Sequence, residues 1–320
     1  MPGNHAKRLR IVRGECMPVN IPDKLPAKAQ LESENIFVMT TSRATAQDMR
    51  PLKIAILNLM PERIKTETQL LRLLGNTPLQ VDIELVRPDS HTSKTTPLSH
   101  ILAFCKPFSE IAGNKYDGFI ITGAPVEHLE FEQVRYWQEL CRIMDWANEN
   151  VISTVYICWG ALAGLYYHYS INKIMLDKKT LGVYPFETID EHNALTRGFD
   201  HVFYAPWSCW ASIDEPALKS NSDLAVLAIS EEVGIHIAAS KDYKHVFVMG
   251  HMEYDADTLA IEYNRDINKG IKQEIPYNYF PWNSPLNAPV VTWRAHGHLF
   301  FSNWLNYCAH KIIYNTGGKI

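Results

Sequence analysis

The stretch VISTVYICWGALAGLYYHY, residues 151–169, contains a predicted buried strand followed directly by a predicted helix. A β-branched and aromatic run ends at Cys158, and small residues with leucines follow it. A cysteine at such a junction lies next to free backbone N–H groups at the positive end of a helix dipole, where a thiolate is favoured. A buried cysteine is otherwise an inert small hydrophobe, so the rest of the chain must distinguish packing from nucleophilic chemistry.

The elements around this junction alternate between strands and helices. Strands are predicted at 53–59, 79–86, 116–123, 223–230, 234–241 and 245–250, and helices at 62–75, 131–150, 256–270 and 293–314. This order predicts an α/β fold with a mainly parallel sheet and helices on both faces, in a single domain spanning 17–314. The last three strands are close enough in sequence to include antiparallel pairs. We expect residues 1–16 to be a basic, disordered extension and 315–320 a flexible tail.

Composition excludes several classes of function. The 320 residues are 46% hydrophobic and 21% charged, with a net charge of -4, which argues against nucleic acid or an anionic membrane as partner. No apolar run is long enough to span a membrane. The cysteines, at 16, 105, 141, 158, 209 and 308, form no C-x-x-C motif, so we expect a reduced, cytoplasmic protein without disulfides. His296 and His298 lack further ligands at suitable spacing, and no metal is expected.

Special residues follow three of the predicted strands. ITGAPVE (121–127), CWG (158–160) and GHMEYD (250–255) each stand where an apolar run stops. Parallel strands present their carboxyl ends at one edge of the sheet, where sites of open α/β folds lie. Cys158 as nucleophile, His251 as base and Glu253 as its acidic partner form the candidate catalytic set. Two residues apart on an extended backbone, His251 and Glu253 point to the same side.

The run around Gly123 and Ala124 predicts a place for an oxyanion. Small residues there let backbone N–H groups approach a reacting carbonyl. The alternative interpretation is a tight turn built around Pro125, just as His251 alone is compatible with a solvated turn.

The motifs together resemble the homoserine O-acyltransferase family, the homoserine transacetylases and transsuccinylases. The matching stretches are NIFVMTTSRA (35–44), the run from Arg50 to Arg87, FIITGAPVE (119–127), ICWGA (157–161), LTRGFD (195–200), FVMGHMEYD (247–255), IPYNYFPWNSP (275–285) and FSNWLNY (301–307). The resemblance implies a flavodoxin-like, glutamine-amidotransferase-like fold. It also implies that Cys158 accepts the acyl group of an acyl-coenzyme A as a thioester, with His251 as base and Glu253 as its partner.

Further roles follow from the same resemblance. Lys179, Ser208 and Arg265 match positions that contact substrate, and Trp159 joins Gly123 and Ala124 at the oxyanion pocket. Glu127 matches a position that is glutamate in acetyl-transferring members and glycine in succinyl-transferring members. These matches imply ping-pong acetyl transfer from acetyl-coenzyme A, a co-substrate, to L-homoserine in methionine biosynthesis, with no tightly bound cofactor.

The chain departs from the family at one segment near the acceptor. Trp207, Cys209 and Trp210 surround Ser208 where the family reads close to PHSRY. Bulky indoles favour a smaller pocket, so L-serine, which lacks one methylene of homoserine, is an alternative acceptor that would place the enzyme in cysteine biosynthesis. Less favoured functions are succinyl transfer, a cysteine hydrolase or amidase, and a binding protein without activity. Small molecules are the expected partners, with a homodimer mediated by residues 21–39.

Overall fold

The computed structural model of the protein describes residues 19–21, 38–40, 51–91 and 95–315. Its strands are β1 (Val19–Ile21), β2 (Val38–Thr40), β3 (Leu52–Leu57), β4 (Val81–Arg87), β5 (Cys105–Pro107), β6 (Tyr116–Ile121), β7 (Val151–Ile157), β8 (Lys173–Thr188), β9 (Val202–Ile213), β10 (Leu224–Ser230), β11 (Gly234–Ser240) and β12 (His245–Val248). Its helices are α3 (Arg63–Leu74), α4 (Leu98–Phe104), α5 (Phe108–Ile111), η1 (Phe131–Gln133), α6 (Trp137–Asn150), α7 (Trp159–Tyr169), α8 (Glu215–Ser220), α9 (Thr258–Asn268), η2 (Pro281–Asn283) and α10 (Arg294–Asn315).

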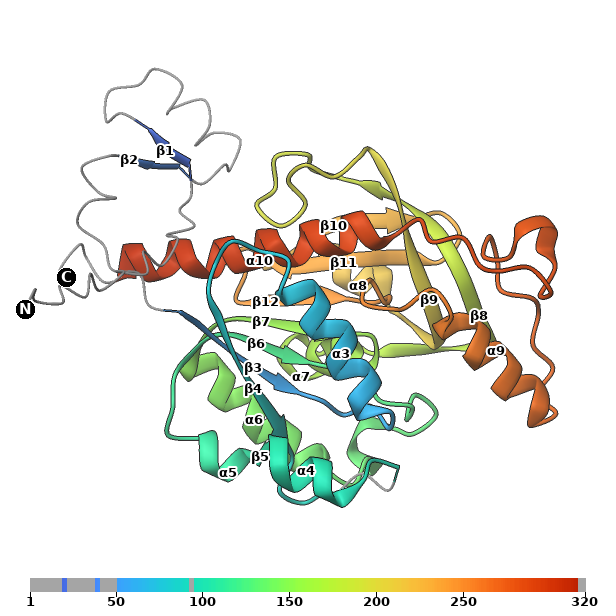
Figure 1. Cartoon of the computed structure of the whole chain (residues 1–320), viewed down its shortest axis with the longest axis horizontal. Helices are drawn as coiled ribbons and strands as arrows, with labels where there is room; N and C mark the ends of the chain where they lie inside the picture. Colours follow the sequence, from blue (N-terminus) through green and yellow to red (C-terminus); the bar gives the residue numbers. More distant parts are fainter. Residues whose placement is uncertain (1–18, 22–37, 41–50, 92–94, 316–320) are drawn as a thin grey trace, which may run out of the picture.

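A ten-stranded mixed sheet organises these elements (Figure 1). Its strand order is β5-β4-β3-β6-β7-β12-β11-β10-β8-β9. The strands from β5 to β12 in that order are all parallel, whereas β11, β10, β8 and β9 pair antiparallel. β1 and β2 form a separate parallel pair. The carboxyl ends of β6, β7 and β12 are therefore neighbours, as the sequence predicts.

Helices cover both faces of the parallel strands. In β6, a Cβ on Gly118 would meet Trp304 of α10, while the next residue, Phe119, makes an edge contact with Trp146 of α6. In β7, Ser153 accepts a hydrogen bond from Trp304, while Tyr156 contacts His168 of α7. Because side chains alternate between the faces of a strand, α10 lies on one face and α6 and α7 on the other. The α/β class predicted from the sequence is confirmed.

One predicted helix is shorter than expected. The spacing of apolar residues predicts a helix over 131–150, but the structure has a 3-10 turn, η1, and then α6 from Trp137. Glu130 and Gln133 form a capping box around η1, and Val134 then adopts an extended conformation that ends the turn. Phe131 and Val134 are buried nonetheless, which explains why their spacing resembles that of a helix.

The long hairpin β8–β9 has no counterpart among the predicted elements. Its two strands pair from Lys173↔Ile213 to Glu187↔Val202, with a shift of register between Met175 and Thr180. The extra residues of β8 lie opposite Trp210 and form a bulge. This hairpin carries Lys179 and Ser208, so it brings predicted site residues to the far edge of the sheet.

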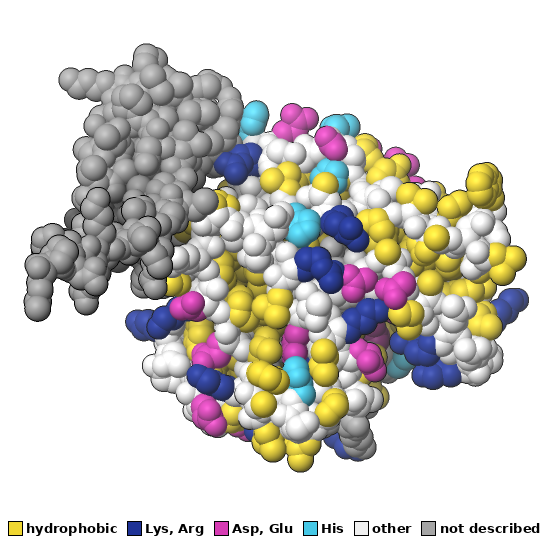
Figure 2. Space-filling view, in the orientation of Figure 1, with side chains coloured by type: hydrophobic (Ala, Val, Ile, Leu, Met, Phe, Trp, Pro, Cys, Tyr) yellow, Lys and Arg dark blue, Asp and Glu magenta, His cyan; other side chains and the backbone are white. Residues whose placement is uncertain are grey.

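The surface agrees with the modest net charge. On the face in Figure 2, acidic and basic side chains are interspersed with hydrophobic ones and form no large field of one sign. No helix in the described ranges is long and apolar enough to span a membrane. The predicted extension 1–16 lies outside the described residues, as does most of the segment predicted to mediate a homodimer; both stay predictions.

Two stacked histidines connect α7 to β12. The rings of His168 and His245 lie 4.1 Å apart. Tyr156 donates to His168 Nε2 (2.9 Å), Tyr169 donates to His245 Nδ1 (2.8 Å), and His245 Nε2 donates to Asn148 Oδ1 (2.7 Å). Each ring accepts a hydrogen bond at an unprotonated nitrogen, so both imidazoles are neutral in this arrangement. Burial lowers the pKa of His168 to about 4, and burial together with His168 lowers the pKa of His245 to about 3.

We predict that this pair makes the fold sensitive to acid. Both imidazoles have folded pKa values below the unfolded value of 6.5, so their contribution is complete above pH 6.5 and is lost as pH falls toward 4. Each contributes a slope of up to about 1.4 kcal/mol per pH unit in the free energy of unfolding. Asp145 and Asp242 oppose this effect, and Lys244 adds to it.

Denaturant unfolding between pH 7 and pH 4.5 measures that slope. His245→Gln should flatten it, whereas the same change at the exposed His201 should not. Equal slopes in all three proteins would show that the stacked pair does not cause the acid sensitivity.

Candidate functional site

Cys158 stands in a strained turn between β7 and α7. Its φ is 52° and its ψ is -118°, values that a non-glycine residue adopts only when its surroundings enforce them. A Cβ on Gly160 would lie 2.7 Å from the carbonyl oxygen of Thr122, and a Cβ on Gly123 would lie 3.2 Å from the Cβ of Cys158. The turn therefore requires glycine at position 160 and packs closely against Gly123 at the neighbouring strand end. It presents the thiol at the carboxyl edge of the sheet.

His251 and Glu253 follow β12, the neighbour of β7. His251 Nδ1 donates to Glu253 Oε1 at 2.7 Å, and both side chains are buried. The sequence predicts an extended backbone here. The structure instead has a turn, in which the N–H of Tyr254 donates to the carbonyl oxygen of His251 at 3.3 Å. The expected pairing is present, but a turn produces it.

The charges of this group influence one another. Burial lowers the pKa of His251, but Cys158 and Glu253 outweigh it, so that the pKa lies well above the usual value. The hydrogen bond with Cys209, together with burial, raises the pKa of Cys158. The charge of His251 and its hydrogen bond with the thiol oppose that rise, so His251 is the group placed to take the proton of Cys158.

Backbone from two strand ends meets beside the thiol. The amide nitrogen of Trp159 lies 3.6 Å from the position that a Gly123 Cβ would occupy. Ala124 and Trp159 are buried next to it. The three residues predicted for the oxyanion pocket are therefore brought together around Cys158, and their role there stays a prediction.

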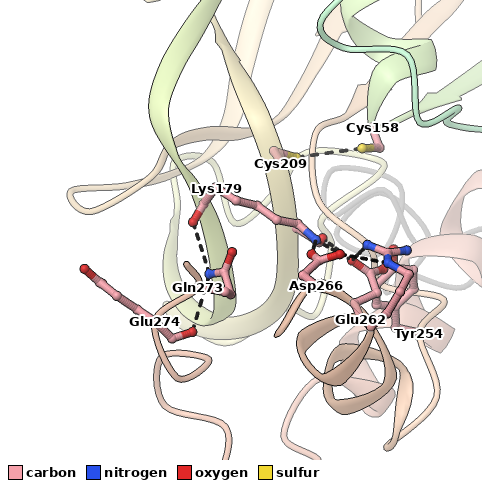
Figure 3. A network of polar contacts seen from close by, with 10 residues as sticks. Cys158, Lys179, Cys209, Tyr254, Glu262, Asp266, Gln273 and Glu274 are labelled. Atoms are coloured by element: carbon pink, nitrogen blue, oxygen red, sulfur yellow. Dashed lines mark hydrogen bonds and ion pairs between the residues drawn. The ribbon is translucent and has the colours of Figure 1, made fainter. Parts of the chain in front are cut away.

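A buried ionic cluster forms around Lys179 (Figure 3). Lys179 Nζ contacts Glu262 Oε2 and Asp266 Oδ2, both at 2.9 Å, and its side chain is only 4% exposed. Two carboxylates compensate one buried ammonium, which would otherwise be costly to desolvate. The resemblance implies a substrate contact for Lys179; in the structure two of its three donors already have partners.

Glu262 is the residue that sequence reasoning missed. Besides Lys179, it accepts hydrogen bonds from Ser208 and from the Tyr254 hydroxyl, the latter at 2.8 Å. The ring of Tyr254 stacks on His251 with centroids 4.1 Å apart. Glu262 precedes Arg265 by three residues in a predicted helix, a spacing that places both on one face and was the available signal.

Arg265 marks the solvent side of this cluster. Its Nε donates to Asp266 Oδ1 at 2.8 Å, and 48% of its side chain is exposed. The guanidinium lies next to Glu262 of the same helix, α9, and Arg265 Nη2 is 3.9 Å from Glu262 Oε2. A half-exposed, oriented guanidinium is suited to binding a carboxylate through two parallel bonds.

Glu127 lies in the loop after β6 and faces the same region. Lys173 of β8 holds this loop by donating to the carbonyl oxygens of Glu127 and Leu129. Burial raises the pKa of the Glu127 carboxyl, and the charges of Lys179 and His251 oppose that rise. These interactions place the carboxyl within electrostatic reach of both the catalytic group and the ionic cluster.

The residues that flank Ser208 in β9 do not all line the same side of the strand. Trp207 and Cys209 lie on one face of the strand, and Ser208 and Trp210 on the other, because side chains alternate. Trp207 is buried and lines a cavity of about 10 Å³ with Cys158, Cys209 and Met249. Trp210 is half-buried and packs against His128 at 5.1 Å. Only one indole therefore shares the face of Ser208, contrary to the expectation that both surround it.

One group in the described ranges has metal-ligating side chains close together. The ligand atoms of Glu67, His100 and Cys105 lie within 4.8 Å of one another. The buried Arg63 interacts with both Glu67 and Cys105, and so already supplies positive charge at that point. This arrangement gives no support to a cation there, and the absence of a metal stays a prediction.

Comparisons with known proteins agree on a family and a fold. A family model described as homoserine O-succinyltransferase matches residues 18–314. A homoserine O-acetyltransferase of Acetivibrio thermocellus is 53% identical over 92% of this chain and 97% of its own length. One of Thermotoga neapolitana is 54% identical over 92% and 97%, and a homoserine O-succinyltransferase of Proteus mirabilis is 51% identical over 92% and 96%.

Solved structures resemble the fold alone. A glutamine amidotransferase from Thermotoga maritima matches 82% of this chain and 99% of its own, with a TM-score of 0.55 and 13% identity. A putative GMP synthase protein from Thermoplasma acidophilum matches 84% and 99%, with a TM-score of 0.54 and 14% identity. The glutamine-amidotransferase-like fold predicted from the sequence is confirmed.

We predict that Glu253→Gln slows catalysis and shifts its pH dependence. The carboxylate raises the pKa of His251, so its removal should lower that pKa and move the acid limb of the kcat/KM profile to lower pH. The loss of orientation of the imidazole should reduce kcat by about 10² or more. Tyr254→Phe, which leaves the carboxylate in place, is the matched control. A reduced kcat with an unmoved acid limb would contradict a direct role of Glu253 in setting the pKa of His251.

Proposed function

The chain belongs to the homoserine O-succinyltransferase family and is an acyltransferase, and from this premise we propose that it moves acetyl from acetyl-coenzyme A to the side-chain hydroxyl of L-homoserine. The observation that carries the proposal is the buried group of Cys158, His251 and Glu253 at neighbouring strand ends. Relatives named homoserine O-acetyltransferase over nearly the whole chain support the donor and the acceptor. The product is an activated homoserine for methionine biosynthesis.

In the first half-reaction, Cys158 Sγ attacks the thioester carbonyl of acetyl-coenzyme A while His251 takes its proton. The negative charge of the tetrahedral intermediate falls next to the backbone at Gly123, Ala124 and Trp159. The intermediate collapses by breaking the bond to the coenzyme sulfur, which receives the proton from His251. Acetyl remains on Cys158 as a thioester.

In the second half-reaction, the homoserine hydroxyl loses its proton to His251 and attacks the acetyl carbonyl. The bond to Cys158 Sγ breaks, and the thiol recovers the proton. Arg265 binds the amino-acid carboxylate, and Ser208 and Lys179, fixed by Glu262, shape the other side of the acceptor site. Because coenzyme A leaves before the acceptor reacts with the acetylated cysteine, the two half-reactions give ping-pong kinetics.

L-serine is the second candidate acceptor. The observation in its favour is Trp207, which fills the cavity beside Cys158 and leaves about 10 Å³, room for about one water molecule. One methylene is worth only about 1–3 kcal/mol of discrimination. A cytoplasmic location and the absence of a tightly bound cofactor are further parts of the proposal.

Release of coenzyme A from acetyl-coenzyme A tests the proposal. We expect release to depend on L-homoserine, to show parallel lines in double-reciprocal plots, and to disappear in Cys158→Ala. L-serine is assayed in parallel, and a higher kcat/KM with serine would assign the enzyme to cysteine biosynthesis instead. Acetyl-coenzyme A consumption without any amino acid would indicate a hydrolase and overturn acyl transfer.

We predict that Glu127→Gly admits a succinyl group. The carboxylate of Glu127 repels the distal carboxylate of succinate, by up to about 4 kcal/mol for charges about 4 Å apart at an effective dielectric near 20. Its removal should raise the ratio of kcat/KM for succinyl- over acetyl-coenzyme A by roughly 10- to 10³-fold. Glu127→Gln removes the charge and keeps the volume, and so separates repulsion from steric exclusion. An unchanged ratio in both variants would place donor specificity elsewhere.

A further inference from the structure

Cys209 lies against the catalytic thiol. The Sγ atoms of Cys158 and Cys209 are 3.7 Å apart, the one contact between cysteines in the part of the chain that the structure describes (Figure 3). Both residues are buried, and neither is bonded to the other in the structure. Cys209 belongs to β9, at the edge of the sheet, whereas Cys158 follows β7, so the two thiols come from strands that are far apart in the sheet order.

The geometry allows these sulfurs to bond. A disulfide needs an S–S distance of about 2.0 Å, so the atoms must approach by less than about 2 Å in total. Cys209 makes only one other polar contact, a weak one of 3.7 Å to the carbonyl oxygen of Met249. Both cysteines line the adjoining cavity, so their side chains border free space into which they can rotate toward each other.

Cys209 takes no part in the ionic cluster. Its neighbour Ser208 faces Glu262 from the other side of the strand, whereas Cys209 faces Cys158. The contact with Cys209, together with burial, raises the pKa of Cys158, and a thiol is a weaker nucleophile than a thiolate. Within the described residues, the polar contacts of the Cys209 side chain are those with Cys158 and with the carbonyl oxygen of Met249, and neither gives it a part in acyl transfer.

We propose that Cys209 is a resolving thiol, and that oxidation by a peroxide locks Cys158 and Cys209 into a reversible disulfide that switches the enzyme off. In the first step, Cys158 Sγ, deprotonated by His251, attacks one oxygen of hydrogen peroxide. The O–O bond breaks, and the leaving hydroxide takes the proton from His251, giving a sulfenic acid and water.

In the second step, the Cys209 thiol attacks Cys158 Sγ. The S–O bond breaks, and the hydroxide leaves with the Cys209 proton as a second water. Two thiols are oxidised and one peroxide is reduced. Without Cys209, the sulfenic acid persists and is oxidised further to a sulfinic acid, which ordinary thiol reductants do not reverse.

Peptide mapping tests the bond directly. Trypsin releases residues 143–173 with Cys158 as the only cysteine, and 198–219 with Cys209 as the only cysteine. We expect hydrogen peroxide to join these two peptides, with loss of two hydrogens, and dithiothreitol to separate them. This readout does not depend on acyl transfer, so it distinguishes failure of the disulfide from failure of the proposed function. Absence of the joined peptide in the inactivated protein would overturn the proposal.

Variants test the protective role of Cys209. Each protein is inactivated with peroxide, treated with dithiothreitol and compared with its own untreated activity. The recovered fraction should be about ten-fold lower in Cys209→Ser and Cys209→Ala than in the unaltered chain, with a sulfinic acid on Cys158. Cys141→Ser removes a thiol that lies elsewhere, on α6, and should recover as the unaltered chain does. Equal recovery in all four proteins would show that Cys209 does not resolve the oxidised nucleophile.

Discussion

The strained turn at Cys158 is the constraint on which the rest of the site depends. A residue with positive φ at the end of β7 is tolerated only because the backbone of the neighbouring strand end packs against it. That packing leaves no room for a side chain at Gly160 and little at Gly123. The same crowding that fixes the thiol also brings backbone N–H groups beside it. One local arrangement thus places the thiol that we propose as nucleophile beside the backbone that we propose to stabilise charge on a reacting carbonyl.

Electrostatic organisation extends from this turn through a single aromatic ring. Tyr254 stacks on His251 and donates to Glu262, which in turn binds Lys179 and Ser208. The catalytic pair and the ionic cluster are therefore mechanically joined, although they come from different elements. A shift of α9, which carries Glu262, would therefore change how Tyr254 packs on His251. The buried Lys179 is costly to desolvate alone, so its retention with two carboxylates favours a role in fixing this geometry.

The sequence predicts most of the parallel half of the sheet, because its strands are continuous apolar runs and its helices have clear periodicity. The carboxyl-end positions of Cys158 and His251 follow from that order alone. The sequence does not predict the hairpin β8–β9, since its two strands are long and irregular in burial, β8 contains a bulge, and a loop over 189–201 joins the strands instead of a tight turn. Consequently the ionic cluster, to which the hairpin contributes Lys179 and Ser208, was known only through resemblance, and Glu262 was missed. The pairing of Cys158 with Cys209 spans β7 and β9 and needs three-dimensional packing to be seen.

Transfer of an acyl group to an alcohol in water requires that water itself be a poor competitor. Cys158, His251 and Glu253 are all buried, and the cavity beside the thiol has room for about one water molecule between Trp207 and Met249. Proteins that share this fold at 13% or 14% identity include a glutamine amidotransferase, so the fold alone does not determine which nucleophile completes the reaction. Under the proposed mechanism, this apolar lining limits water at the thioester, and the polar groups lie around the proposed acceptor side. Selection of an amino-acid hydroxyl over water would then depend on the residues that close the site: Trp207 on the β9 face next to the thiol and the cluster held by Glu262 on the other.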